Sequence, residues 1–178
     1  MKIKMIVAHD KDNGIGFKNI IPWDIKSDLK KFKNLTVGNN KNAIVMGRNT
    51  WESIKNPLSK RDNLILSNTI KLDFSFTNNN INNLVKSFTN ITYLINFCKE
   101  RDYDEVWIIG GSKIYDIFLN SNDYLIDEIY ITYFDSIFKC DTFFPKIPEN
   151  KYKFMSSSLH ITCNDTNFII YDKIYNLI

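Results

Sequence analysis

The sequence has few of the side chains that cross-link small proteins or bind metals. Its 178 residues include three cysteines without paired spacing, Cys98, Cys140 and Cys163, and two histidines, His9 and His160. A disulfide framework and a metal site are therefore not expected, and the thiols are predicted to be reduced. A chain of this length can bury a sizeable core without such cross-links.

Long hydrophobic runs are also missing. No apolar stretch approaches the length of a membrane span, and residues 1–8 are followed too early by charged and turn-forming residues to resemble a signal peptide. The fractions of hydrophobic (44%) and charged (24%) residues are ordinary for a globular protein. The sequence therefore predicts a cytoplasmic protein with no membrane partner, built as one domain over residues 1–178.

Arginine is scarce as well. Only Arg48, Arg61 and Arg101 occur among the 23 basic residues, and the lysines are spread along the chain rather than gathered in one tract. The net charge of +3 therefore favours small anionic ligands over nucleic acid. Asparagine, isoleucine and lysine are abundant, which indicates an AT-rich genome in which arginine gives way to lysine. A retained arginine is then a candidate for a task that needs a planar, bidentate donor.

Apolar runs separated by turn residues predict alternating strands and helices. Strands are expected at residues 2–9, 42–46, 63–66, 106–109 and 126–134, and helices at about 25–36, 50–56, 91–100 and 112–119. Asn49 and Glu52 have the spacing of a capping box for a short helix that Pro57 ends, and Asn90 is expected to cap the third helix.

Two regions do not follow this alternation. The asparagine-rich residues 71–90 are interpreted as a surface insertion or flexible loop. Near the end of the chain, strands at residues 152–159 and 167–175 are expected to flank a turn at Asn164 and Asp165. Together the pattern predicts an α/β fold with a mixed, mostly parallel sheet, helices on both faces and an antiparallel C-terminal edge.

Two strand-to-helix junctions contain glycine followed by a basic residue: Gly47-Arg48, and Gly110-Gly111 with Lys113 two positions later. Glycine lets the backbone approach a ligand closely, and a helix N-terminus attracts phosphate. The alternative is that these glycines only form turns. Neither junction matches G-x-G-x-x-G, so the standard dinucleotide motif is absent.

The first helix places an acid on its apolar side. Asp28 lies three residues after Ile25 and four before Phe32, on the stripe that also includes Leu29. Asp28 either complements the helix dipole or faces a cleft and binds a cationic or amidine-like ligand. The spacing alone leaves both open. The lysines of this helix, at positions 26, 30, 31 and 33, are predicted to point to water.

Two further residues have ordinary structural interpretations. Trp23, next to Pro22, is expected to anchor the entry of the helix. Thr132 is a polar residue among apolar ones in the strand IYITYF, and most threonines in strands are structural.

Seven segments occur in an order that resembles dihydrofolate reductase, namely MIVAHDKDNGIG, IPWDIKSDLKKF, IVMGRNTWESI, NLILS, VWIIGGSKIY, IYITYFD and CDTFFP. The resemblance covers nearly the whole chain and implies a mixed eight-stranded sheet. It also implies NADPH-dependent reduction of 7,8-dihydrofolate to tetrahydrofolate, by hydride transfer to pterin C6 and protonation of N5, in support of one-carbon metabolism and thymidylate synthesis. The implied inhibitors are antifolates such as methotrexate. The chain would be a monomer or part of a fusion with thymidylate synthase.

The resemblance also implies roles for individual residues around the substrate. Asp28 would hydrogen-bond N3 and the 2-amino group of the pterin, Thr132 would support that acid, and Trp23 would lie beside them. Arg61 matches the arginine that grips the α-carboxylate of the glutamate tail, a bidentate task. The other substrate-binding residues implied are Ile6, Val7, Ala8, Leu29, Phe32, Ile54, Leu58, Ile109 and Tyr115.

For NADPH, the resemblance implies two phosphate turns and a closing loop. The first turn and its neighbours are Gly47, Arg48, Asn49, Thr50, Leu66, Ser67 and Asn68. The second is Gly110, Gly111, Ser112, Lys113 and Ile114, with a cis peptide expected between the glycines. Residues 13–21 would form the loop, and the contacts near the nicotinamide would be Ala8, Ile15, Gly16, Ile21, Trp23, Ile109 and Tyr115.

The chain departs from the family pattern at one of the implied cofactor contacts. Lys113 stands where an arginine often helps to hold the 2′-phosphate, so a preference for NADP rests more on Arg48.

Two other functions are alternatives to dihydrofolate reduction. One is a reductase of the same fold that acts on a pyrimidine intermediate of riboflavin synthesis, but it has no need of Arg61 or of the pattern from Trp23 to Phe32. A protein that binds nucleic acid through its lysines is the other, and it predicts clustered cations.

Overall fold

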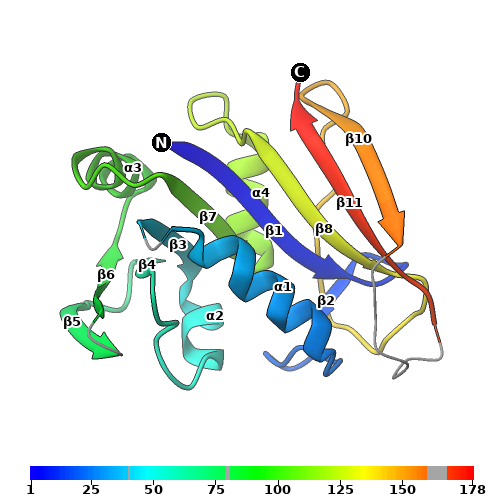
Figure 1. Cartoon of the computed structure of the whole chain (residues 1–178), viewed down its shortest axis with the longest axis horizontal. Coiled ribbons are helices and arrows are strands. Elements are labelled where there is room, and N and C mark those ends of the chain that lie inside the picture. Colours follow the sequence, from blue (N-terminus) through cyan, green and yellow to red (C-terminus); the bar gives the residue numbers. More distant parts are fainter. Residues whose placement is uncertain (40, 79–80, 160–167) are drawn as a thin grey trace.

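A computed structural model describes residues 1–39, 41–78, 81–159 and 168–178. Within these residues, nine strands form one sheet in the order β10-β11-β8-β1-β7-β3-β4-β6-β5 (Figure 1). The strands from β8 to β6 in this order run parallel, and antiparallel pairs lie at both edges. The bounds are β1 Lys2–His9, β3 Asn42–Gly47, β4 Asp62–Leu66, β5 Asp73–Asn78, β6 Ile81–Phe88, β7 Glu105–Gly110, β8 Glu128–Phe134, β10 Tyr152–Leu159 and β11 Ile170–Leu177.

Helices cover both faces of this sheet, with α1 in front of β1 and α4 behind it in Figure 1. Alternate residues of β1 serve the two faces: Met5 and Val7 belong to the core with residues of α3 and α4, and Ile6 packs in a second core with residues of α1 and α2. Burial on both faces explains why residues 5–8 of β1 are all apolar. The helices are α1 Lys26–Val37, α2 Arg48–Ser53, α3 Ile91–Glu100 and α4 Ser112–Asn120, and β2 Gly14–Gly16 pairs with β9 Thr142–Phe143 in a small second sheet.

The predicted α/β class, with its mostly parallel sheet and antiparallel C-terminal edge, is confirmed, but the loop expected at residues 71–90 is wrong. Strands β5 and β6 occupy most of this range, so the sheet has nine strands among the described residues rather than eight. In β6, Val85 is fully buried, and Asn83 is buried while its Oδ1 accepts a hydrogen bond of 2.8 Å from the amide of Lys60. The asparagine occupies an inward position of a strand, and its polarity concealed the alternation.

Of the two caps predicted at helix starts, one is present in the structure and one is not. The Asn90 cap is confirmed, because its Oδ1 accepts a 2.7 Å hydrogen bond from the amide of Thr92. The capping box at Asn49 is wrong: α2 follows Gly47 directly, has no side-chain cap, and ends at Ser53 before Pro57. The turn predicted at 164–165 lies outside the described residues.

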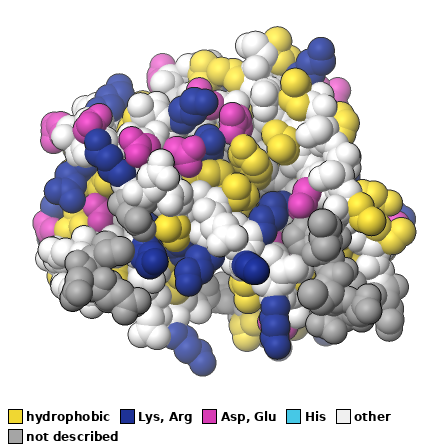
Figure 2. Space-filling model, viewed as in Figure 1, with side chains coloured by type: hydrophobic (Ala, Val, Ile, Leu, Met, Phe, Trp, Pro, Cys, Tyr) yellow, Lys and Arg dark blue, Asp and Glu magenta, His cyan; other side chains and the backbone are white. Residues whose placement is uncertain are grey.

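Charges of both signs are interspersed on the face of the molecule that Figure 2 shows. Among the described residues, none of the helices has both the length and the apolarity needed to cross a membrane.

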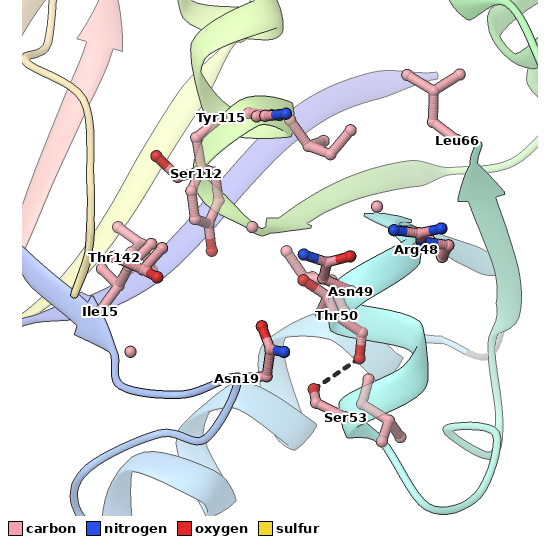
Figure 3. A pocket seen from close by; sticks show the side chains of 18 of the residues that line it. Ile15, Asn19, Arg48, Asn49, Thr50, Ser53, Leu66, Ser112, Tyr115 and Thr142 are labelled. Carbon is pink, nitrogen blue, oxygen red and sulfur yellow. Dashed lines mark hydrogen bonds between the residues drawn. The ribbon is translucent and has the colours of Figure 1, made fainter. Parts of the chain in front are cut away.

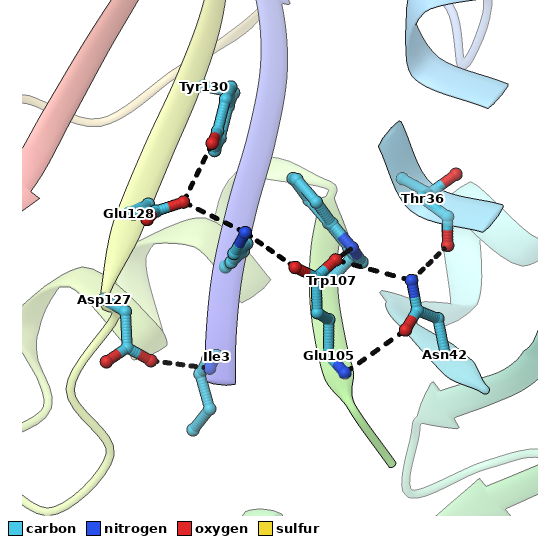
Figure 4. Close-up of polar contacts among 9 residues, drawn as sticks. Ile3, Thr36, Asn42, Glu105, Trp107, Asp127, Glu128 and Tyr130 are labelled. Carbon is cyan, nitrogen blue, oxygen red and sulfur yellow. Dashed lines mark hydrogen bonds and ion pairs between the residues drawn. The ribbon is translucent and has the colours of Figure 1, made fainter. Parts of the chain in front are cut away.

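A buried ionic network lies at the amino ends of the central strands (Figure 4). The ammonium of Lys4 is 2.7 Å from Glu105 Oε1 and 3.0 Å from Glu128 Oε2, and its side chain is 11% exposed. The indole of Trp107 donates to Glu105 at 2.9 Å, and the hydroxyl of Tyr130 donates to Glu128 at 2.8 Å. Each carboxylate therefore has both a cation and a neutral donor, which offsets the cost of burying it.

These contacts shift two pKa values in the directions expected for stabilising pairs. Burial opposes the charge on Lys4, but hydrogen bonds to Glu105 and Glu128 raise its pKa above the ordinary value. Burial also opposes the charge on Glu128, but the bonds from Tyr130 and Lys4 lower its pKa. Both shifts favour the charged, paired form in the folded state.

Replacing Lys4 by methionine should reduce the free energy of unfolding by about 2 kcal/mol, because two partly buried carboxylates lose their cation. Urea unfolding at neutral pH measures the change. Lys41→Met is the matched control, since Lys41 pairs with Asp102 at 2.7 Å on the surface, where both side chains are at least half exposed, and its loss should change stability little. Similar losses in both variants would contradict the importance of the network.

The difference in stability between wild type and Lys4→Met should depend on pH. The folded-state pKa of Glu128 lies below its unfolded value of about 4.3, so its contribution is present above that pH and is lost as the pH falls through the folded value. The stabilities of wild type and Lys4→Met should therefore converge in acid. A difference that stays constant as the pH falls would be the opposite result.

Candidate functional site

A cleft of about 1310 Å³ opens where several parallel strands end (Figure 3). Its floor and walls include Ala8 at the end of β1, Gly47 at the end of β3, Leu66 at the end of β4 and Ile109 near the end of β7. Helices α1, α2 and α4 supply the sides. Ligands of open α/β sheets bind at this position, outside the carboxyl ends of the strands.

The structure brings most of the predicted site residues together in this cleft. Those that line it are Ile6, Val7, Ala8, Ile15, Gly16, Ile21, Trp23, Asp28, Leu29, Phe32, Gly47, Arg48, Asn49, Thr50, Ile54, Leu58, Leu66, Ser67, Asn68, Ile109, Gly111, Ser112, Lys113, Ile114 and Tyr115. Three predicted residues are not in the lining, namely Arg61, Gly110 and Thr132.

Several lining residues were not predicted, among them Ser53, Thr69, Asp141, Thr142 and Phe143, and Asn19 was predicted only as part of the closing loop 13–21. Figure 3 shows Asn19 and Thr142 on the side of the cleft opposite Arg48 and Leu66. Asp141, Thr142 and Phe143 belong to CDTFFP, one of the seven segments on which the resemblance to the family rests. Thr142 and Phe143 pair with β2, and this pairing brings them to the cleft.

The position of Asp28 is compatible with both interpretations that its spacing left open. It lies in the first turn of α1, whose N-cap Ile25 makes no side-chain cap, and its half-buried side chain also lines the cleft. Across the site, the buried hydroxyl of Tyr115 donates to the carbonyl of Ile6 at 2.9 Å. Burial raises the pKa of Tyr115, and the negative charge of Asp28 raises it further. The phenol therefore stays neutral, and Asp28 is the acid on this wall.

Leu29 and Lys31 depart from the predicted helix pattern. Leu29 is 52% exposed, because the cleft, and not the core, lies in front of it. Lys31 was expected to point to water, which is wrong: its side chain is only 17% exposed, and its ammonium donates to Thr132 Oγ1 at 3.1 Å.

Arg61 lies directly behind the cleft wall. It is 3% exposed, and its guanidinium carbon is 5.6 Å from the ring centroid of Phe32, which lines the cleft. Within the described part of the chain, its Nε and Nη1 atoms are buried without hydrogen-bond partners. Burial lowers the pKa of Arg61 to about 10, which leaves it charged at neutral pH. Such a cation fits an anionic group that enters from the cleft.

The two glycine turns lie next to each other, at the ends of the neighbouring strands β3 and β7. A side chain at Gly47 would place Cβ 3.0 Å from the side chain of Ile114, so β3 packs closely against α4 there and a larger residue would have to displace Ile114. Gly110 has φ of +112°, a conformation that only glycine adopts readily, and the expected cis peptide to Gly111 is confirmed. Helix α4 begins without a side-chain cap, so its N-terminal amides are not satisfied by a protein side chain.

Polar groups gather near the end of β4. Arg48 Nη1 donates to Thr69 Oγ1 at 3.2 Å, and the hydroxyl of Ser67 is 3.3 Å from the same oxygen. Arg48 also lies 3.7 Å from Glu52, in an exposed pair. The cluster supplies a cation and hydroxyl groups at one end of the cleft.

Trp23 both anchors α1 and lines the cleft. Its ring packs against Phe134 and Phe138 at centroid distances of 4.6 and 5.1 Å, as expected for an anchor. Its indole N–H is buried and has no hydrogen-bond partner in the described residues. The indole can therefore donate to a molecule in the cleft.

A buried carboxylate connects the two loops at the cleft entrance. Asp10 Oδ1 accepts hydrogen bonds from the amides of Asp12 and Gly14, at 3.0 and 2.6 Å, and its Oδ2 accepts one of 2.9 Å from the amide of Phe138. Farther along, Asp141 Oδ2 accepts a 2.9 Å hydrogen bond from the amide of Lys18. Backbone hydrogen bonds from Lys11 to Ser136 and from Asp141 to Gly16 join the same two segments, so the loop after β1 is bonded to the segment between β8 and β9 at several points.

Comparisons with known proteins agree with this geometry. A family model described as dihydrofolate reductase matches residues 2–175. The chain is 36% identical over 163 residues to a dihydrofolate reductase of Schistosoma mansoni, covering 86% of this chain and 83% of that one. It is 34% identical over 145 residues to the Staphylococcus aureus enzyme of the same name, covering 82% and 79%.

Larger relatives match as well. The chain is 36% identical over 173 residues to bifunctional dihydrofolate reductase-thymidylate synthase 1 of Arabidopsis thaliana, covering 93% of this chain and 33% of the relative. It therefore spans about a third of the length of that bifunctional protein. The match over nearly all of the chain confirms the resemblance seen in the sequence, and the chain belongs to the dihydrofolate reductase family.

Proposed function

We propose that this chain reduces 7,8-dihydrofolate to tetrahydrofolate with NADPH. The observation that carries the proposal is the placement of one acid, Asp28, on a wall of the cleft that is otherwise formed by apolar side chains such as Ile6, Leu29 and Phe32. A flat heterocycle with an amidine-like edge suits this wall, because its faces meet apolar side chains and its edge meets the carboxylate. Family membership supports the choice of a pterin.

The residues at the other end of the cleft fit NADPH. Arg48, Ser67 and Thr69 offer a cation and hydroxyl groups for the 2′-phosphate, and the uncapped start of α4 with Gly111 and Ser112 offers backbone amides for the pyrophosphate. The tight contact between Gly47 and Ile114 brings the two turns close enough to serve one molecule. When bound, NADPH supplies the hydride.

Four groups of this chain position the substrate in the proposed mechanism. Asp28 accepts hydrogen bonds from N3 and the 2-amino group, and its charge favours the protonated pterin. Arg61 binds the α-carboxylate of the glutamate tail, which would supply the partner that its buried nitrogens otherwise lack within the described chain. The indole of Trp23 and the loop of residues 13–21 close the site and exclude bulk water. The proton for N5 arrives through water, because Asp28 binds the opposite side of the ring.

The proposed product places the protein in cytoplasmic one-carbon metabolism. Two Arabidopsis relatives carry thymidylate synthase in their names, which supports this placement and leaves a monomer or a fusion as the proposed forms of this chain.

Mixing the purified protein with NADPH and dihydrofolate tests the proposal. The absorbance of NADPH should decay, and methotrexate should stop the decay. No decay would reject the proposed reaction. Decay that is blind to methotrexate would reject the proposed pterin site.

Asp28→Asn should reduce turnover of dihydrofolate by about a hundredfold or more at neutral pH, because the amide cannot give charge-assisted bonds to the pterin. The loss should be smaller in acid, where the substrate is already protonated. The matched control is Asp24→Asn, an exposed acid four residues earlier that does not line the cleft. Turnover of Asp28→Asn near the wild-type value at neutral pH would contradict the role of the acid.

Arg61→Lys should raise KM for dihydrofolate by about tenfold and leave KM for NADPH unchanged, since lysine lacks the bidentate fork. Dihydropteroate, which lacks the glutamate tail, separates the tail contact from a general loss of structure. Its KM should be the same in wild type and Arg61→Lys. Equal losses with both substrates would show that Arg61 acts on packing and not on the tail.

A further inference from the structure

The turn of residues 58–61 carries two residues with proposed contacts to the substrate, Leu58 and Arg61. Leu58 lines the cleft, and Arg61 is buried behind its wall. The turn ends where β4 begins, and Lys60 within it has φ of +66°, a left-handed conformation that residues other than glycine seldom adopt. Such a conformation persists where the surrounding structure fixes it.

A buried asparagine bonds to both ends of this turn. Asn63 is fully buried, and its Nδ2 donates to the carbonyls of Leu58 and Arg61, each at 2.9 Å. Its Oδ1 accepts a hydrogen bond of 2.9 Å from the amide of Leu58. Most of the hydrogen-bonding capacity of this side chain is therefore directed at the two ends of one turn.

A second buried asparagine bonds to the middle of the turn. Asn83 of β6 is buried, and its Oδ1 accepts a hydrogen bond of 2.8 Å from the amide of Lys60. This contact holds the residue that has the left-handed conformation. Neither asparagine lines the cleft, so both act on the turn from behind.

Arg61 has a guanidinium that is only partly engaged by the protein. Its neighbour Asp62 accepts hydrogen bonds from the hydroxyl of Tyr103 at 2.5 Å and from Arg101 at 3.3 Å, so that carboxylate is already paired. Within the described residues, Nε and Nη1 of Arg61 have no hydrogen-bond partners. A guanidinium whose donors are kept for a ligand has to be positioned through its backbone, and Asn63 bonds to that backbone.

We propose that Asn63 and Asn83 are positioning residues for Arg61. Their side-chain amides fix the turn of residues 58–61, so that the guanidinium stands where the α-carboxylate of the substrate tail arrives. The inference rests on the proposed function, because it concerns the same substrate. It adds a determinant of specificity: two amides outside the cleft set how strongly the protein prefers a pterin with a glutamate tail to one without it.

The physical reason is the geometry of a bidentate contact. Two parallel N–H···O bonds between a guanidinium and a carboxylate need both groups aligned, so a small displacement weakens both bonds. Without Asn63, the carbonyls of Leu58 and Arg61 lose a buried donor, and the turn has to relax towards other partners. The contact with the tail should then weaken more than the contacts with the pterin ring, which Asp28 of α1 makes in the proposed site.

The experiment measures Kd for dihydrofolate and for dihydropteroate, which lacks the glutamate tail. Quenching of tryptophan fluorescence reports both, since Trp23 lines the cleft. The tail preference is the Kd of dihydropteroate divided by the Kd of dihydrofolate. Asn63→Ala should lower the tail preference by about fivefold, and Asn83→Ala, which removes one hydrogen bond rather than three, by about twofold.

Two further variants show whether the effect passes through Arg61. The matched control is Asn42→Ala: Asn42 is a buried asparagine of β3 that bonds to the backbone of Thr36 and Glu105, so its loss should reduce stability without changing the tail preference. In Arg61→Met the guanidinium is gone, so adding Asn63→Ala should leave the tail preference of that variant unchanged. A further fall in the double variant would overturn the inference.

The outcomes separate this inference from the proposed function. Absence of NADPH-dependent turnover by wild type rejects the proposed function, whereas the Kd values are measured without turnover. If wild type shows no preference for dihydrofolate, the inference falls together with the role of Arg61. A wild-type tail preference in Asn63→Ala overturns the inference alone, because a purely structural loss weakens both ligands equally. If Asn63→Ala does not fold, Asn83→Ala decides, and an unchanged tail preference in that variant overturns the inference.

Discussion

The parallel alignment of β1, β7, β3 and β4 is the constraint on which the rest of the structure depends. Backbone hydrogen bonds fix a register that brings their carboxyl ends to one edge of the sheet. The same register decides which side chains face the cleft. A slip of one residue in β1 would exchange the face of Ile6 with that of Val7, and the walls built by α1 and α4 would meet the wrong side chains.

Two buried cations of this structure have different surroundings. At the amino ends of the central strands, Lys4 is surrounded by protein carboxylates, and each carboxylate has a further protein donor. Next to the amino end of β4, behind the cleft wall, the buried nitrogens of Arg61 have no such partners in the described residues. The first arrangement stabilises the fold, and the second leaves binding capacity for a ligand, which is the usual division between a structural and a functional cluster.

Much of this could be predicted from local sequence. Strand β1, the Asn90 cap and most of the cleft lining follow from hydrophobic runs, capping chemistry and family motifs. Strand β6 could not, because a buried asparagine satisfied by a distant amide looks the same in composition as a solvated one. Lys31 could not either, since its partners lie 101 and 141 residues away in the chain. Periodicity predicts which face a residue occupies, but only tertiary contacts decide whether a long side chain on a helix flank turns back to the protein.

The Asp10 carboxylate has a mechanical consequence. Because its two oxygens bond to amides on both loops at the cleft entrance, the start of the loop after β1 and the segment around Phe138 are coupled as one body. A displacement that opens the cleft on one side must carry the other loop with it or break bonds to a buried charge. The two loops are therefore tied together at their root near Asp10, and the hydrogen bonds that join Gly16 and Lys18 to Asp141 extend this coupling along the loop.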